Sequence, residues 1–173
     1  YIDGTWFAAG FYTQILVKNG KTFGLNGTKI FSAKRASPSR ESCCRWSGII
    51  SENRTVLNWE NIELKDAQFA LYLPTLTFLD GAKLNFKGNK FTEVINGIIS
   101  NSHKFNPVVF QNNLFSGCTD CTPLCGCGDG EGIKMNNIQL SGISFPFSTI
   151  KNEIRLFTEG IHAINTNLNA KSF

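Results

Sequence analysis

Charged side chains are scarce in this sequence, since Asp, Glu, Lys and Arg make up only 17% of its 173 residues. The formal net charge is +4, and the basic residues are spread along the chain. Domains that bind nucleic acids usually gather basic residues into a dense patch or stripe. The one tight basic cluster lies among Ser and Pro, as expected for a solvated loop, and comprises Lys34, Arg35, Arg40 and Arg45. We therefore expect no nucleic-acid partner.

Long apolar runs are also missing. No stretch approaches the roughly 20 residues that a membrane-spanning helix requires, and the first residues lack the pattern of a signal peptide. Hydrophobic residues nevertheless make up 42% of the chain and include 15 Phe, which is not the composition of a disordered chain. We expect residues 1–173 to form a single domain with its own core and no membrane span.

Six cysteines, four of them within ten residues, favour an oxidising compartment and hence an extracellular protein whose signal segment has been removed. Two glycosylation sequons, which begin at Asn26 and Asn53, fit the same location. We predict disulfides that staple the loops, with Cys43 and Cys44 each bonded to a different cysteine, and the connectivity stays open. The alternative is a zinc site of four thiolates. The cysteines are Cys43, Cys44, Cys118, Cys121, Cys125 and Cys127.

A recurring pattern runs through the rest of the chain. Five segments, including LNFKGNKF at 84–91 and VVFQNNLF at 108–115, read apolar, any residue, apolar, a polar pair and then apolar again. The second apolar positions are Trp59, Phe86, Phe110, Met135 and Ala163, at steps of 27, 24, 25 and 28 residues. Repeats of this length are typical of solenoids. We predict that Trp59, Phe86, Phe110 and Met135 lie one above another as a core ladder.

The polar pair has a physical role in such a repeat. Asparagine adopts the left-handed backbone conformation more cheaply than most residues, and Gly88 adopts it without a Cβ penalty. One such residue turns the chain through a corner, so the alternation of VVFQ resumes in another phase after Asn112 and Asn113. Equivalent asparagines would then stack, and their side-chain amides can hydrogen-bond along the stack.

These segments resemble the coils of a right-handed parallel β-helix, the fold of pectate lyases and of many adhesins. FKGN at 86–89 and FQNN at 110–113 also resemble the F-x-x-N repeat of autotransporter-type adhesins. The resemblance is best over residues 55–145, where NGIISNS at 96–102 resembles a further strand of the same coil. It implies an all-β, single-stranded right-handed parallel β-helix of about six coils.

The C-terminal part suggests two structures. Ile150, Ile154, Phe157 and Ile161 have helical spacing, with a capping residue at Ser148 or Thr149. A C-terminal helix that covers the open end of the solenoid therefore competes with a last coil.

Catalytic and metal-ligating residues are not evident. Glu60 and Glu63 should be solvated, and His103 and His162 are isolated in the sequence. Other acids, which do not stack at one coil position, are Asp66, Asp80 and Glu93. Calcium could bind an oxygen-rich loop with Asp120, Asp129 and Glu131, but the spacing matches no standard calcium loop. We predict no catalytic residues, no metal and no cofactor.

Three functions remain. The first is a non-catalytic, secreted structural or adhesive protein that associates with itself, as in a filament, or with a cell-surface glycan. The second is a carbohydrate-active or carbohydrate-binding β-helix, in which Trp46 or Tyr72 stacks on sugar. The third is a lipocalin-type carrier of a small apolar ligand, because GTWF at 4–7 resembles the lipocalin G-x-W motif. Carboxylates from successive coils in one groove would favour the second, and antiparallel strands the third.

Overall fold

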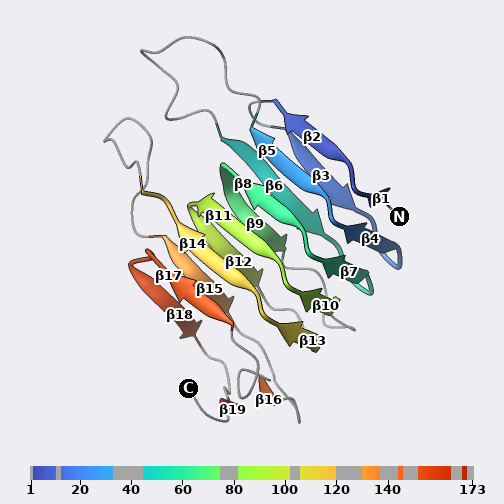
Figure 1. Ribbon diagram of the computed structural model, residues 1–173. Helices are drawn as coiled ribbons and strands as arrows, with labels where there is room; N and C mark the ends of the chain where they lie inside the picture. Colours follow the sequence, from blue (N-terminus) through green and yellow to red (C-terminus); the bar gives the residue numbers. More distant parts are fainter. Residues whose placement is uncertain are drawn as a thin grey trace.

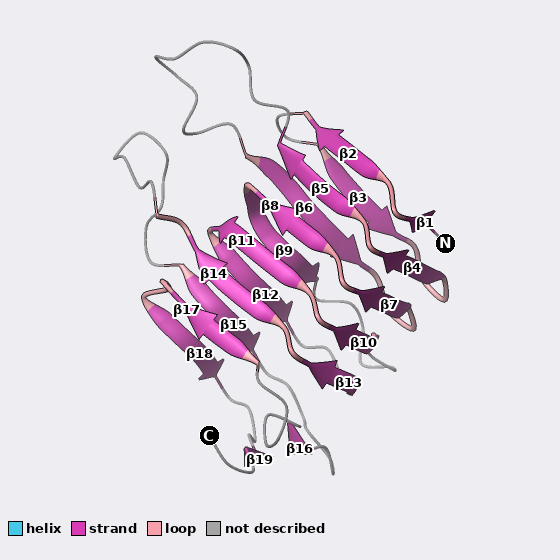
Figure 2. Ribbon diagram, in the orientation of Figure 1, coloured by secondary structure: helices cyan, strands magenta, loops and turns pink. Residues whose placement is uncertain are grey.

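The computed structural model describes residues 2–10, 13–32, 45–74, 82–101, 106–119, 130–136, 144–145, 152–164 and 169–170. All of the regular structure in this part of the chain is β-strand, with no helix (Figure 2). Accordingly, no helix long and apolar enough to cross a membrane occurs among these residues.

Three parallel sheets make up most of the fold (Figure 1). Sheet A contains β1 (Ile2–Asp3), β4 (Thr22–Asn26), β7 (Val56–Glu60), β10 (Lys83–Lys87) and β13 (Asn106–Gln111). Sheet B contains β2 (Trp6–Ala9), β5 (Lys29–Ser32), β8 (Glu63–Lys65), β11 (Lys90–Val94), β14 (Leu114–Gly117) and β17 (Glu153–Arg155). Sheet C contains β3 (Gln14–Val17), β6 (Trp46–Ser51), β9 (Ala67–Leu73), β12 (Asn96–Asn101), β15 (Glu131–Asn136) and β18 (Glu159–Ile164). A separate pair is formed by β16 (Ser144–Phe145) and β19 (Asn169–Ala170).

From β1 to β15 the chain visits A, B and C in turn, and the last described passage, β17 and β18, adds strands to B and C, so that within each sheet a strand pairs with the strand three places along the chain. We call one passage through A, B and C a triplet. This order is that of a β-solenoid-like class, as the 24–28-residue repeat predicted. The lipocalin interpretation is wrong, because all strand pairs among the described residues are parallel, whereas a lipocalin barrel is antiparallel.

The corner between sheets A and B depends on residues in the left-handed region. Glycine or asparagine occupies this position in successive triplets, two residues before sheet B begins. The backbone φ values are 58° at Gly4, 56° at Gly27, 53° at Asn61, 67° at Gly88 and 54° at Asn112. Because both residue types tolerate a positive φ, the chain changes direction there without a longer loop.

The residue after this corner forms a buried asparagine ladder. Asn89 and Asn113 are 0% and 1% exposed. The Nδ2 of Asn89 donates to Asn113 Oδ1 at 3.0 Å, and Asn113 Nδ2 donates to Asn152 Oδ1 at 3.0 Å. Each amide also donates to a carbonyl of the preceding triplet, at Trp59, Phe86 and Phe110 respectively. The predicted hydrogen bonding along an asparagine stack is therefore present.

Inward-facing side chains from all three sheets form one hydrophobic core. In sheet A, Phe86 is the register partner of Trp59 on one side and of Phe110 on the other. The ring centroids of Trp59 and Phe86 lie 4.4 Å apart and those of Phe86 and Phe110 lie 5.9 Å apart. A parallel column in sheet B stacks Phe91 on Phe115 at 4.6 Å. Stacked rings of this kind add to the stabilisation from burial.

Met135 does not belong to the sheet A column, and its place in the predicted ladder is wrong. It is buried in β15 of sheet C, where its register partners are Ser100 and Ala163. The predicted step of 28 residues from Met135 to Ala163 does correspond to one triplet, but both residues lie in sheet C and not in sheet A. The error arises because strands of all three sheets share the same period-two apolar pattern.

The described residues 152–164 form the strands β17 and β18 with a corner between them, so the predicted C-terminal helix is wrong over this range. Strand β17 pairs with β14, and β18 pairs with β15. Ile154 and Ile161 pack against the core from two different strands. A corner at Leu156, with φ 59°, separates these strands, and this interruption gives the apolar residues a spacing similar to that of a helix. Ser148, Thr149 and Ile150 lie outside the described residues.

We predict that Asn113→Ala lowers the free energy of unfolding by about 2–4 kcal/mol. The substitution leaves Phe86 O and Asn89 N without this partner in the core, and each such group costs about 1–3 kcal/mol. Urea unfolding followed by circular dichroism measures the change. The matched control is Asn85→Ala. Asn85 is half-buried and its Nδ2 donates to Asn58 Oδ1, so its removal should lower the free energy of unfolding by about 1 kcal/mol or less. Equal losses would show that the ladder has no special role.

Candidate functional site

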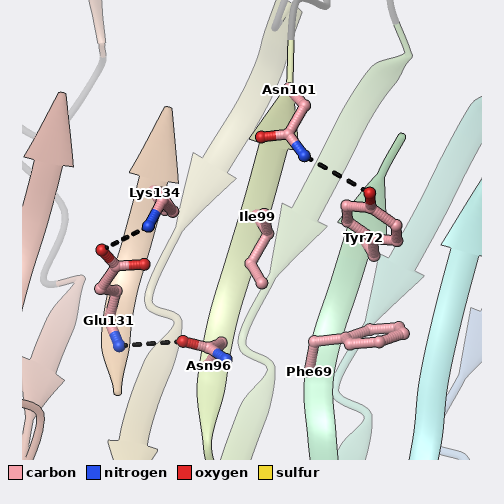
Figure 3. A pocket seen from close by; sticks show the side chains of 7 residues that line it. All are labelled: Phe69, Tyr72, Asn96, Ile99, Asn101, Glu131 and Lys134. Carbon is pink, nitrogen blue, oxygen red and sulfur yellow. Dashed lines mark hydrogen bonds and ion pairs between the residues drawn. The ribbon is translucent and has the colours of Figure 1, made fainter. Parts of the chain in front are cut away.

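A shallow groove crosses the outer face of sheet C over strands β9, β12 and β15 (Figure 3). Its volume is about 460 Å³. The lining combines two aromatic rings, one aliphatic side chain, two amides and two opposite charges. These residues are Phe69, Tyr72, Asn96, Ile99, Asn101, Glu131 and Lys134.

The parallel register places these side chains in two columns. Tyr72, Ile99 and Lys134 are register partners on three successive strands, and they alternate with the buried residues Leu71, Ile98 and Ile133. We call Tyr72, Ile99 and Lys134 the second column. Because successive side chains of a strand point to opposite faces, this column points outward, away from the core. In the first column, Phe69 is the register partner of Asn96. The backbone N–H of Glu131 donates to Asn96 Oδ1 at 3.0 Å, which joins the third strand to this column.

Glycines behind the first column let neighbouring strands approach closely. Gly97 follows Asn96, Gly132 follows Glu131 and Gly160 follows Glu159. A Cβ at Gly97 would clash with the carbonyl oxygen of Gly132, and a Cβ at Gly132 would clash with Ile154 and with the carbonyl oxygen of Gly160. Only glycine fits at 97 and at 132, so these two residues determine where the first column lies.

The aromatic end of the groove is formed by Phe69 and Tyr72, whose ring centroids lie 5.5 Å apart with an interplanar angle of 53°. Asn101 Nδ2 donates to Tyr72 Oη at 3.4 Å. Both rings are half-buried, so part of each remains accessible from solvent. This end offers apolar surface beside amide donors and acceptors.

The other end is charged. Glu131, whose side chain is only 12% exposed, accepts a hydrogen bond from Lys134 Nζ at its Oε1, 2.8 Å away. His162 Nδ1 lies 2.6 Å from the same oxygen and 2.7 Å from Glu159 Oε2. The register of β15 and β18 explains this cluster, because Glu131 is the partner of Glu159, and Lys134 of His162. The expectation that His162 is isolated is therefore wrong.

No family model, curated protein or solved structure matches this chain. The geometry of the groove and its chemistry therefore carry the functional argument.

The predicted sugar-stacking residues have different positions in the structure. Tyr72 lines the groove, as one alternative required. Trp46 is 0% exposed, and its Nε1 donates to Lys65 O at 3.0 Å, so a role in stacking on a ligand is wrong for this residue. The sequence pattern did not identify six other residues at the groove and its charged end, which are Phe69, Asn96, Ile99, Asn101, Lys134 and Glu159.

The remaining described acids do not form a catalytic group with the groove. Glu60 pairs with Lys87 at 3.0 Å and Glu63 pairs with Lys29 at 3.2 Å, both on solvated faces as expected. Glu93 accepts hydrogen bonds from Thr119. Asp66 occupies a corner with φ 57°. Asp80, His103, Asp120 and Asp129 lie outside the described residues.

A carboxylate on the opposite edge of sheet C has a structural role. The backbone N–H of Asn19 donates to Glu52 at 2.8 Å and Lys18 Nζ lies 3.0 Å away, and these two contacts, in that order, lower the pKa of Glu52 below its usual value. They join the turn after β3 to the turn after β6.

The two sequons and Cys118 lie at corners or directly after strands. Asn26 ends β4, and Asn53 lies in the turn before β7, whereas the hydroxyl-bearing residues Thr28 and Thr55 are buried. Cys118 directly follows β14, and its Sγ accepts a hydrogen bond from Arg45 Nη2 at 2.9 Å. No disulfide joins two described residues, because Cys43, Cys44, Cys121, Cys125 and Cys127 lie outside them.

We expect Gly132→Ala to destabilise the fold by about 1–3 kcal/mol, the usual cost of overpacking. Its Cβ would collide with the backbone of Gly160, which cannot move away without separating β15 from β18. Thermal unfolding gives the comparison with Gly10→Ala, whose Cβ meets only Thr13 Cγ2 at 3.5 Å and should be harmless. Similar melting temperatures for the two variants would contradict this account of the groove.

Proposed function

We propose that this protein is a non-catalytic, extracellular adhesive β-solenoid that binds oligosaccharides through the groove on sheet C. The supporting observation is the groove itself, where half-buried Phe69 and Tyr72 lie beside Asn96, Asn101 and Glu131.

Sugars present both apolar C–H faces and polar hydroxyls. An aromatic ring provides a large, rigid apolar surface for the first. Amides and carboxylates provide donors and acceptors for the second, and a few convergent polar groups on an apolar floor are typical of ligand sites. Because the groove crosses successive strands, it suits a chain of sugars better than a single ring.

The contacts of Glu131 support binding without catalysis. Glycoside hydrolysis generally requires one carboxyl group that can give a proton to the leaving oxygen. Glu131 Oε1 instead accepts a hydrogen bond from Lys134 and lies 2.6 Å from His162 Nδ1, so its nearest partners are basic side chains of the same sheet. The two carboxylates from successive triplets, Glu131 and Glu159, are thus better suited to binding a ligand through their charge than to acting as a general acid and a nucleophile.

The finer architecture belongs to the same proposal. We infer a closed, right-handed β-helix whose loops are stapled by disulfides among the six cysteines, with glycans at Asn26 and Asn53. The contact between Arg45 and Cys118 supports the disulfides, since Arg45 directly follows Cys44 in the sequence and lies against a second cysteine. An oxidising, extracellular location is consistent with this chemistry.

Self-association is a second candidate, supported by the sheet edges at the first triplet. Among the described residues, β1, β2 and β3 each pair with one strand only, namely β4, β5 and β6. Unpaired parallel edges can accept strands from a second copy, which would extend the stack into a filament.

Tyr72→Ala is expected to weaken oligosaccharide binding at least about tenfold, or about 1.4 kcal/mol, because it removes the ring that would pack on a sugar face. A panel of oligosaccharides screened by array and then measured by calorimetry provides the test. Phe31→Ala is the matched control, since Phe31 is a half-buried aromatic residue on β5 of sheet B, away from the groove. Absence of any oligosaccharide ligand, or equal losses in both variants, would refute the proposed site.

Electron microscopy of the purified protein tests self-association separately. End-to-end stacking predicts filaments whose length increases with protein concentration. Monodisperse particles at all concentrations would contradict it and would leave the groove proposal unaffected.

A further inference from the structure

The charged end of the groove contains three groups that commonly ligate metal ions. Glu131, Glu159 and His162 each direct one ligand atom into the same small volume, and these atoms lie within 4.8 Å of one another. One carboxylate is from β15, and the other two groups are from β18. Gly132 allows the close approach of β15 and β18 that brings them together, because a Cβ there would clash with the carbonyl oxygen of Gly160.

A single imidazole nitrogen faces both carboxylates in this arrangement. His162 Nδ1 lies 2.6 Å from one carboxylate and 2.7 Å from the other. A ring nitrogen carries at most one proton, so the two carboxylates must share it in a three-centre hydrogen bond. Two carboxylate charges then depend on a single N–H. A cation coordinated by the nitrogen and both oxygens satisfies all three atoms together.

The donor set indicates which cation fits. Imidazole nitrogen favours first-row transition metals over calcium and magnesium, and carboxylate oxygen is compatible with them. Three protein ligands on a half-exposed face also leave positions for water or a ligand hydroxyl, as in open zinc sites. We propose that Glu131, Glu159 and His162 bind a divalent transition-metal ion of the Zn²⁺ class.

Lys134 is the internal competitor of this ion. Its ammonium group lies 2.8 Å from Glu131 Oε1, the same oxygen that faces His162. A bound cation must displace or tolerate this charge, which lowers affinity for the metal. This competition distinguishes the site from a nonspecific surface site. Removal of the Lys134 side chain should raise the affinity for the metal, whereas removal of the Glu159 carboxylate should lower it.

The metal site goes beyond oligosaccharide binding and does not require it. Glu131 lines the groove as well as the metal site, so a bound ion would lie at the end of the groove. Sugar hydroxyls could then reach the open positions of the ion. Measurement of metal binding without sugar, and of sugar binding with a chelator, separates the two proposals, because either can fail while the other holds.

The test is a Zn²⁺ titration of the full chain, with its thiols alkylated so that cysteines do not bind the metal. The chain has two histidines, so imidazole resonances in histidine-labelled protein report the site directly, and a His103→Gln variant assigns them. We expect Zn²⁺ to shift the His162 signals and not those of His103. Glu159→Gln should weaken the affinity at least about tenfold, and Lys134→Gln should increase it several-fold.

The matched control is Glu153→Gln on β17, an exposed glutamate paired with Arg155, which should leave the affinity unchanged. Circular dichroism of each variant shows whether the fold is retained. The proposal is overturned if Zn²⁺ does not shift the His162 signals. It is also overturned if Glu159→Gln and Lys134→Gln, both folded, bind Zn²⁺ as the unaltered protein does.

Discussion

The hydrogen bonds between buried asparagines are the interaction on which the rest of the structure depends. The amides of Asn89 and Asn113 each donate to a carbonyl of the previous triplet and to the next amide, so each connects three levels of the stack. The left-handed residue just before it sets the corner between sheets A and B. Together they keep the register in which Trp59, Phe86 and Phe110 stack, and a buried amide so fully bonded costs little to bury.

The groove is a consequence of the same register on another face. Because parallel strands repeat residue against residue, two outward columns on sheet C become continuous surfaces across β9, β12 and β15. Within these columns the chemistry changes from aromatic at Phe69 and Tyr72 to charged at Glu131 and Lys134. One regular backbone thus presents an apolar end and an ionic end within a single groove.

The sequence predicted the parts of the fold that depend on local chemistry. The left-handed corners at Gly88 and Asn112 and the stacked asparagines follow from residue type and spacing. The assignment of strands to sheets does not follow from residue type and spacing. Met135 and Phe110 have the same alternating sequence around them, and only the strand pairing shows that they lie in different sheets. The charged end of the groove was harder to predict, because Glu131, Glu159 and His162 come together through a strand register that no local sequence pattern encodes. The glycines at 97 and 132 were the available signal for close strand approach.

The asparagine ladder does not extend through the whole stack. At the equivalent position Ile62 supplies only its backbone N–H to Asn89 Oδ1, and in the triplet before it Thr28 hydroxyl donates to the carbonyl of Ile2. The levels from β7 onward are therefore linked by a continuous amide chain, and the first two are not. Amide hydrogen exchange should divide the molecule at this boundary, with the later levels opening as one cooperative unit and the early levels fraying at lower cost.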